Sequence, residues 1–182
     1  MFKKFTRNDD VASYTQVKSS EARRIRKSIS EQYPDYDEQF DAIFKKKAPM
    51  HVAKCHNHVQ LIADENNVIW FFSYRKSEFI PTLRTLHRFP KMLPVLQVDR
   101  GAIKFVLSGA NIMSPGLTSP GGRMDTDVDQ DTVCAIYAEG KEHALAIGVT
   151  KMSTEKIRSE NKGIAVDVLH HLNDGLWTMP SL

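Results

Sequence analysis

The sequence predicts an α+β protein, and three observations predict it. Two segments with apolar residues at helical spacing lie early in the chain, three strand-like runs follow them, and the second half is mostly strand with short helices. At 182 residues the chain can form one domain or two small ones. The short connector Lys91–Pro94 places the boundary, giving domains of residues 1–92 and 93–182. The strand content of the second domain is compatible with a small β-barrel.

Composition is typical of a globular protein. Apolar residues make up 41% of the chain, so we expect a packed core rather than disorder. The longest uninterrupted apolar run, Val133–Ala138, is far shorter than the ~20 residues that a membrane span needs. No apolar segment follows the basic start Met1–Lys4, so no signal peptide is expected. Two cysteines, Cys55 and Cys134, are too few for a disulfide framework, and we expect a cytoplasmic protein.

Charge is divided unevenly along the chain. The overall net charge of +3 is too small to indicate nucleic-acid binding by itself. Residues 1–92 carry 17 lysines and arginines against 11 acidic residues, a net charge of +6, whereas residues 93–182 carry 8 against 11, a net charge of −3. The asymmetry suits a phosphate-facing surface that lies largely on the first domain, and it also suits the commoner case of solvated charge.

The first helix is predicted over residues 18–33. Ser19 or Ser20 can cap it, and an apolar stripe follows at helical spacing. The basic side chains on the remaining surface can meet RNA phosphates or form a plain solvated face. With two arginines of a later helix, the candidate basic surface consists of Arg23, Arg24, Lys27, Arg84 and Arg88.

The rest of the first domain alternates between helix and strand signals. Asp35 and Glu38 have the spacing of a capping box for a second helix. Three strands are then predicted over His51–Cys55, Val59–Ala63 and Val68–Tyr74. Pro81 is predicted to open a third helix, and Pro90 to end it.

The second domain opens on the stretch Val98–Gly122, which predicts one compact helix and a loop system. Asp99 is a good N-cap, and Gly109 stands where a left-handed residue ends a helix. The buried face of the helix is predicted to be Ala102, Ile103, Val106 and Leu107. Two turn signals follow, Ser114-Pro115-Gly116 and Ser119-Pro120-Gly121-Gly122.

An acidic loop and further strands complete the chain. Aspartates alternate along Met124–Asp131, but Gln130 and Ile136 occupy the positions where a calcium loop needs Gly and Glu, so we interpret a polar loop. Strands are predicted over Thr132–Ala138, Ala144–Thr150 and Gly163–His170, with a short helix over Ser153–Ser159 that Ser153 caps. We expect Ile164, Val166 and Val168 on one apolar face, and His170 and His171 on the surface at the edge of the barrel.

The sequence offers no assembled catalytic site. It contains no phosphate-binding loop, no Gly-x-Gly-x-x-Gly turn and no Gly-x-Ser-x-Gly elbow. His51, Cys55, His56 and His58 crowd one segment, but in a strand they divide between two faces, which argues against a zinc site. We therefore expect no catalytic residue, no cofactor and no metal.

Features that suit RNA binding gather in the Val98–Gly122 stretch. Cationic side chains lie near the helix start, and small residues around the following turn let a nucleic-acid backbone approach backbone N–H groups. The alternative is that the glycines only satisfy turn geometry. The candidate RNA-binding residues are Arg100, Gly101, Lys104, Ser108, Gly109, Ala110, Asn111, Pro115 and Gly116.

Several motifs together resemble one protein family. They are the opening Met1–Phe5, the stretch Val98–Pro120, and the late segments Asn161–Ile164 and Leu172–Trp177. The chain resembles the malignant T-cell amplified sequence proteins, called translation-machinery-associated proteins in fungi, along essentially its whole length. The resemblance implies an N-terminal α/β-mixed pre-PUA domain followed by a PUA pseudo-β-barrel, in which the helix of Val98–Gly122 and the loop after it line the RNA-facing groove.

The resemblance also implies a function. Proteins of this family are non-catalytic translation factors that bind the small ribosomal subunit as a heterodimer with the density-regulated protein. They promote release of deacylated tRNA and mRNA after termination, and they support reinitiation. The RNA in the groove would be ribosomal RNA or the tRNA acceptor end. Two alternatives stay open: an RNA-binding accessory subunit of an RNA-modification enzyme, and a protein-interaction adaptor.

Overall fold

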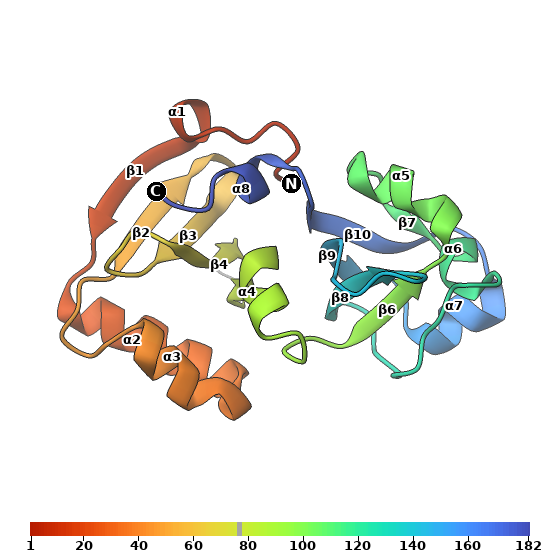
Figure 1. Ribbon diagram of the computed structural model, residues 1–182, viewed down its shortest axis with the longest axis horizontal. Coiled ribbons are helices and arrows are strands. Elements are labelled where there is room, and N and C mark those ends of the chain that lie inside the picture. The colour runs from red at the N-terminus through yellow and green to blue at the C-terminus, as the bar shows by residue number, and fades with distance from the viewer. Residues whose placement is uncertain (76–77) are drawn as a thin grey trace. The chain divides into compact units, whose positions relative to one another are not determined.

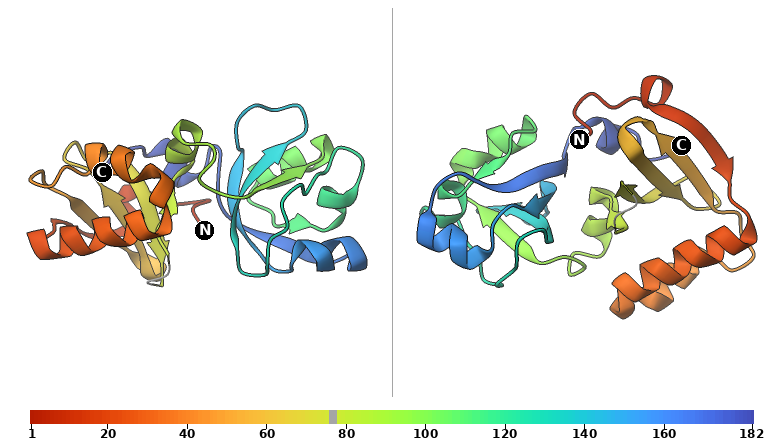
Figure 2. Two further views of the ribbon diagram at one scale, coloured as in Figure 1. Left: turned by 90° about the horizontal axis from the view of Figure 1, so that it is seen from below. Right: turned by 180° about the vertical axis from the view of Figure 1, so that it is seen from behind.

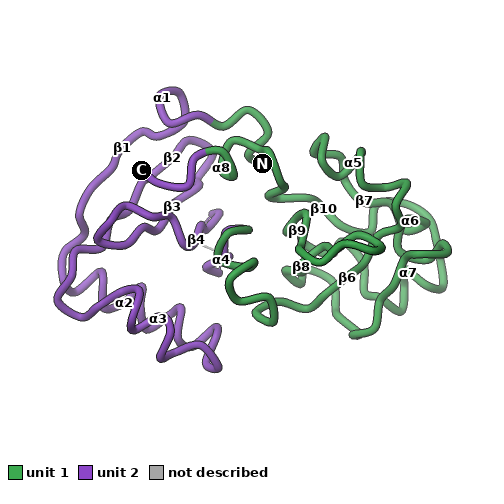
Figure 3. The backbone as a smooth tube through the Cα atoms, in the orientation of Figure 1, with its two compact units in different colours: residues 1–5, 83–178 green, residues 6–82, 179–182 purple. Residues whose placement is uncertain are grey.

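A computed structural model describes residues 1–75 and 78–182, which cluster into two compact units, coloured in Figure 3. Unit 1 consists of Met1–Phe5 and Leu83–Thr178, and unit 2 consists of Thr6–Thr82 and Met179–Leu182. The chain therefore passes from one unit to the other three times. Residues 83–92 cluster with unit 1, and the domain boundary between residues 92 and 93 stays a prediction.

Unit 2 is a five-stranded antiparallel sheet with two helices along one face (Figure 1). Its strands, in their order across the sheet, are β1 (Val11–Gln16), β2 (His51–Cys55), β3 (Val59–Ala63), β4 (Ile69–Tyr74) and β5 (Ile80–Pro81). Its helical elements are α1 (Arg7–Asp10), α2 (Ser19–Gln32), η1 (Pro34–Tyr36), α3 (Asp37–Ile43) and η2 (His56–His58). The ring of Phe71 in β4 lies 5.2 Å from that of Phe40 in α3, so the core fills the layer between sheet and helices.

The predicted strands and first helix of unit 2 are confirmed, but three local predictions are wrong. Neither Ser19 nor Ser20 caps α2, because both lie inside its first turn and the N-cap is Lys18. The capping box does not form, since the 3₁₀ turn η1 occupies that segment and α3 begins at Asp37. Pro81 belongs to β5 and does not open a helix; α4 begins at Leu83.

The tail Met179–Leu182 completes unit 2. The N–H of Ile69 donates to the Pro180 carbonyl at 3.0 Å, and the N–H of Leu182 donates to the Asn67 carbonyl at 2.9 Å. Leu182 is buried. The tail therefore pairs with the start of β4, far from it in the sequence.

Unit 1 is built on a five-stranded sheet that curls into a half-barrel, visible from two further sides in Figure 2. The strands, in their order across the sheet, are β6 (Val95–Val98), β8 (Val133–Ala138), β9 (Ala146–Thr150), β10 (Ile164–His171) and β7 (Ile112–Met113). Only the pair β6–β8 of this described sheet is parallel. The helical elements are α4 (Leu83–Arg88), η3 (Arg100–Ala102), α5 (Ile103–Leu107), α6 (Pro115–Thr118), α7 (Thr154–Glu160) and α8 (Gly175–Thr178).

The capping predictions in unit 1 are confirmed. The Asp99 carboxylate accepts from the Ala102 N–H at 2.9 Å, and the Ser153 hydroxyl accepts from the Lys156 N–H at 3.2 Å. Gly109 has φ +83°, the left-handed conformation that ends a helix at low cost. The turn predicted at Ser114-Pro115-Gly116 is wrong, because Pro115 lies in the first turn of the short helix α6.

Burial contradicts the sequence in β10. Ile164, expected on the apolar face, is 43% exposed, because it lies at the end of the strand beside the two-residue edge strand β7. His170 and His171, expected on the surface, are 1% and 6% exposed. His170 contacts two segments that the sequence did not assign to any element.

One of those segments is the N-terminus. Phe2 is 1% exposed, and its ring centroid lies 5.8 Å from that of His170. The N–H of Gly175 donates to the Phe2 carbonyl at 2.8 Å. Within the described residues, no helix is both long and apolar enough to cross a membrane.

Candidate nucleic-acid interface

A pocket in unit 1 lies where the Val98–Gly122 stretch folds back on itself. It has a volume of about 520 Å³ and is formed by η3, α5, β7 and α6 with their connections. We call it the Phe105 pocket. Its lining residues are Asp99, Gly101, Ala102, Phe105, Val106, Ala110, Asn111, Ile112, Met113 and Gly116.

Asp99 holds two sides of the Phe105 pocket together. One carboxylate oxygen caps η3 through the Ala102 N–H, and the other accepts from the Ser119 hydroxyl at 2.6 Å. The N–H of Asp99 also donates to the Gly116 carbonyl at 3.1 Å. These bonds fix the start of the first helical turn beside α6, so the local sequence positions the pocket.

Glycine keeps the Phe105 pocket open. A Cβ built on Gly116 would lie 3.8 Å from the Ala102 Cβ and 3.9 Å from Cγ2 of Ile112, which is ordinary contact. Gly116 therefore leaves a methyl-sized volume free in the pocket without any backbone strain that requires glycine.

Large apolar side chains stand exposed at the rim. Phe105 is 56% exposed, Met113 is 50% exposed, and Ile164 pairs with Met113 across the β10–β7 ladder. Sequence analysis missed these three residues. The available signal was that Phe105 lies off the predicted apolar stripe, so a large aromatic ring had to face solvent.

Cationic groups flank this rim. The Nζ atom of Lys104 lies 5.0 Å from the centroid of the Phe105 ring, within the range of a cation–π interaction. The Arg100 guanidinium lies beside the β8–β9 turn, where a Cβ on Gly140 would be 2.9 Å from its Nη2 atom. Both side chains are exposed outside the pocket lining.

The structure places the nine candidate RNA-binding residues within one stretch and gives them different positions. Gly101, Ala110, Asn111 and Gly116 line the Phe105 pocket. The others, Arg100, Lys104, Ser108, Gly109 and Pro115, lie outside its lining. Their contact with RNA stays a prediction. The hydroxyl of Ser108 donates to the Phe105 carbonyl at 2.7 Å, so it serves its own helix.

The candidate basic surface divides between the two units. Arg23, Arg24 and Lys27 lie on α2 in unit 2, whereas Arg84 and Arg88 lie on α4 in unit 1.

Several of these cations already have partners. Arg24 contacts Glu21 at 2.5 Å, and the Lys27 ammonium lies 3.7 Å from Glu31. The Arg84 guanidinium lies 4.1 Å from the Trp177 ring centroid and donates to the Trp177 carbonyl at 3.1 Å.

A buried histidine–aspartate pair lies in the same unit as the Phe105 pocket. The Asp174 carboxylate is 2.8 Å from His170 Nδ1, and it accepts the N–H groups of His171 and Trp177, each at 2.9 Å. Burial lowers the pKa of His170, and the bonded Asp174 carboxylate opposes that shift. The arrangement caps α8 and keeps His170 neutral near pH 7.

The two thiols have the properties of core cysteines. Burial raises the pKa of Cys55 to about 12, with a smaller contribution from Asp10, and burial raises that of Cys134 to about 12. At neutral pH both therefore remain protonated and are poor nucleophiles. Among the described residues, no three His, Cys, Asp or Glu side chains are grouped to hold a metal ion.

Comparison with known proteins also divides the chain in two, although residues 83–90, which cluster with unit 1, fall in the first match. Residues 5–90 match the family model of the Pre-PUA-like domain, and residues 93–175 match that of the "elF2D, PUA domain". A solved protein from Pyrococcus horikoshii superimposes with a TM-score of 0.69 at 22% identity, covering 93% of this chain and 100% of its own. A conserved PUA domain protein from Thermoplasma acidophilum gives a TM-score of 0.63 at 21% identity, over 91% and 98%. The chain is a protein with a pre-PUA and a PUA domain.

Full-length relatives narrow the class. The chain is 51% identical over 177 residues to the Malignant T-cell-amplified sequence 1 homolog of Drosophila melanogaster, covering 97% of both chains. It is 48% identical over 179 residues to Malignant T-cell-amplified sequence 2 of Homo sapiens, covering 98% of both, and 48% identical over 182 residues to the homolog of Dictyostelium discoideum, covering 100% of both. It belongs to the malignant T-cell-amplified sequence family, which confirms the resemblance and the α+β fold expected from it.

Proposed function

We propose that this protein is a non-catalytic, cytoplasmic translation factor that binds the small ribosomal subunit together with the density-regulated protein. In this role it promotes release of deacylated tRNA and mRNA from post-termination subunits and supports reinitiation. Family membership over the whole chain supports the assignment. The RNA in contact with unit 1 is ribosomal RNA or the tRNA acceptor end.

The Phe105 pocket is the observation that carries the RNA-binding part of the proposal. Single-stranded RNA is recognised by stacking unpaired bases on aromatic rings, with cations that meet the backbone. Phe105 offers an exposed ring beside an apolar pocket of about 520 Å³, and Lys104 stands over that ring. A base can stack on Phe105 while Lys104 and Arg100 meet adjacent phosphates.

The test is sedimentation of the purified protein with small ribosomal subunits across a salt series, with and without the density-regulated protein. We expect binding to weaken as the salt concentration rises, because phosphate contacts release counterions. We also expect the density-regulated protein to strengthen it. Absence of binding in both conditions at low salt would overturn the proposal.

Two variants locate the contact. Phe105→Ala should weaken binding about tenfold, since loss of one base–aromatic stack has roughly that effect. Val95→Ala, which also truncates an exposed apolar side chain of unit 1 but lies outside the pocket, should bind normally.

The double variant Arg100→Glu/Lys104→Glu separates RNA binding from an adaptor role. We expect it to lose subunit binding and to keep the density-regulated partner, whereas the equally charged control Lys151→Glu/Lys156→Glu should keep both. If Arg100→Glu/Lys104→Glu bound subunits normally and lost the protein partner, a protein-interaction adaptor would replace the proposal.

A further inference from the structure

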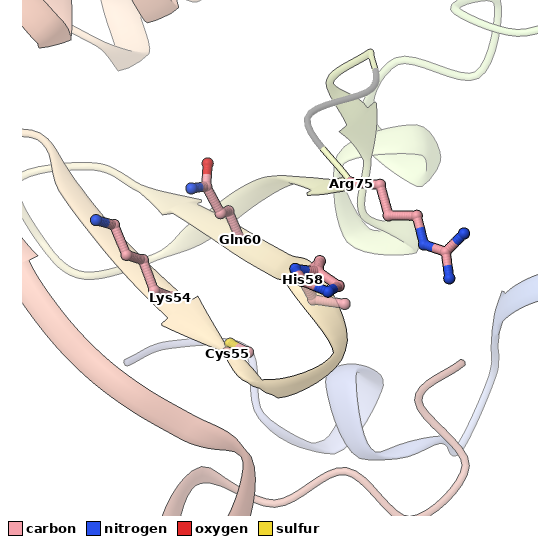
Figure 4. Close-up of a pocket in the computed structure, with 6 residues that line it drawn as sticks. Lys54, Cys55, His58, Gln60 and Arg75 are labelled. Atoms are coloured by element: carbon pink, nitrogen blue, oxygen red, sulfur yellow. The ribbon is translucent and has the colours of Figure 1, made fainter.

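A second pocket lies in unit 2, at the turn that joins β2 to β3 (Figure 4). Its volume is about 460 Å³, and we call it the β2–β3 pocket. Its lining residues are Lys54, Cys55, His58, Val59, Gln60 and Arg75. None of these six residues is acidic. Lys54, His58 and Arg75 have basic side chains, and Gln60 adds an amide donor.

The register of the sheet brings these donors together from three strands. Lys54 of β2 pairs with Gln60 of β3, so both side chains stand on one face. Arg75 follows β4, and its N–H donates to the His58 carbonyl at 3.0 Å, which ties the end of β4 to the turn. In Figure 4 His58 lies between Lys54 and Arg75, and the charged ends of these two side chains point away from its ring in opposite directions.

Neither Lys54 nor Arg75 forms an ion pair within the part of the chain that the structure describes. Among residues 1–75 and 78–182, no carboxylate lies within ion-pair distance of Lys54 or Arg75, whereas Lys45 pairs with Glu65 at 2.6 Å. The Arg75 guanidinium lies 5.1 Å from the ring of its neighbour Tyr74.

The carboxylate of Glu21 interacts electrostatically with Lys54. The pKa of Glu21 lies below its ordinary value, mainly because Arg24 hydrogen-bonds the carboxylate, with smaller contributions from the charges of Arg24 and Lys54. Glu21 therefore feels the charge of Lys54, but its hydrogen bonds come from Arg24.

The turn itself is strained in a way that presents His58. Asn57 and His58 have φ angles of +58° and +62°, and the Val59 N–H donates to the His56 carbonyl. Three residues, His56–His58, join β2 to β3, and this bond closes a turn whose two central residues are both left-handed, a geometry in which glycine is the usual second residue. Histidine at that position carries a backbone cost, and such strain is typical of residues kept for their side chains.

We propose that the β2–β3 pocket binds phosphate groups of a single-stranded RNA backbone. Lys54 and Arg75 meet phosphate oxygens on either side of His58, whose ring, with the Gln60 amide, donates hydrogen bonds between them. Such contacts position a polynucleotide without reading its sequence. The inference rests on the proposed function only in taking RNA as the natural source of phosphate, and it adds residues outside the candidate basic surface.

Substitutions in the strained turn distinguish an effect on RNA binding from an effect on folding stability. His58→Gly removes the ring and relieves the left-handed strain, so it should keep or raise the thermal midpoint while weakening RNA binding about fivefold. Asn57→Gly relieves the same strain at the adjacent position, but Asn57 does not line the pocket, so its RNA binding should be normal.

Charge variants test the phosphate contacts. Lys54→Gln and Arg75→Gln should each weaken binding of a uridine octamer about tenfold. Each should also reduce the slope of the logarithm of the binding constant against the logarithm of the salt concentration by about one. Lys47→Gln, an exposed lysine of unit 2 outside the pocket, is the matched control and should leave both unchanged.

Site-resolved measurement decides the proposal. We expect inorganic phosphate, added to the full chain, to shift the backbone amide resonances of residues 54–60, and the octamer to displace it. If phosphate shifts them and the octamer does not compete, the assignment to RNA is overturned. If neither ligand shifts them, the pocket itself is overturned. Because these resonances are read without ribosomes, failure of subunit binding would count against the proposed function alone.

Discussion

The side-chain oxygen of Asn111 accepts a hydrogen bond from the backbone N–H of Val168, at 3.1 Å. Val168 lies just beyond the ladder between β10 and β7, and the register of β10 against β9 shifts between Val168 and His170. The side chain thus supplies the acceptor that the two-residue strand β7 does not reach. A candidate RNA-binding residue in the Phe105 pocket therefore also stabilises the sheet.

Asn111→Ala should lower the free energy of unfolding by about 1–2 kcal/mol, because it leaves the Val168 N–H without an acceptor in a partly buried position. Asn111→Asp keeps an acceptor at the same place and should be close to the unsubstituted protein. Urea denaturation of the three proteins measures the difference. Equal stability of Asn111→Ala and the unsubstituted protein would show that the hydrogen bond contributes nothing.

Stability should fall as the pH drops below about 6.5, the ordinary pKa of histidine. Burial lowers the pKa of both His170 and His87 in the folded state, so between their folded values and 6.5 the unfolded chain binds more protons. The groups facing His170 are the Asp174 carboxylate, which opposes the shift, and His171 and the N-terminal amine, which add to it.

The measurement is the free energy of unfolding in urea between pH 5 and pH 7.5. Each proton taken up contributes a slope of up to about 1.4 kcal/mol per pH unit. His170→Gln should be less stable at pH 7 and should show a shallower slope, whereas His56→Gln, at an exposed position of unit 2, should keep the original slope. An unchanged slope in His170→Gln would contradict the assignment of this pH dependence to the buried ring.

Gly116 offers a steric test of the Phe105 pocket. Gly116→Ala should fold normally and be slightly more stable, because the added Cβ makes ordinary contacts and alanine favours the helix α6. Gly116→Leu should fill the pocket and weaken RNA binding severalfold. Thermal unfolding and binding to small ribosomal subunits report the two effects, and normal subunit binding by a stably folded Gly116→Leu would place the RNA contact of unit 1 elsewhere.

The opening segment should stabilise unit 1. Phe2→Ala removes a fully buried ring that packs on His170 and should lower the free energy of unfolding by about 3 kcal/mol. Lys3→Ala, at an exposed neighbour, should change it little. Amide hydrogen exchange would locate the loss, which we expect in β10 and α8; a loss confined to unit 2 would contradict the assignment of residues 1–5 to unit 1.

Local sequence signals predicted the regular elements well. Strands β2 and β3 match their predicted bounds, and the caps of Asp99 and Ser153 form as expected, because each depends on a few adjacent residues. Some helix starts were misplaced by a few residues, as at Ser19 and Pro81. The larger failure concerned tertiary contacts. His170 resembles a surface residue until Phe2, far away in the sequence, packs against it, and no local pattern reveals that contact.

The candidate site was predicted by region and only partly by residue. The capping Asp99 and the left-handed Gly109 indicated the fold of the stretch that forms the Phe105 pocket, since the backbone at these two positions favours particular residues. Its exposed rim of Phe105 and Met113 was missed, because the exposure of an apolar side chain depends on whether distant segments of the chain pack over it. The β2–β3 pocket was missed because it needs the register of three strands and a left-handed histidine.

The exchange of terminal segments between the units sets the order in which the chain can finish folding during synthesis. Residues 1–5 are made before unit 2, yet their partners in β10 and α8 are made after it. Unit 2 in turn cannot be completed until residues 179–182 have been made, after the residues of unit 1. Although domains generally fold in order of synthesis, neither unit here can be completed before most of the other has been made.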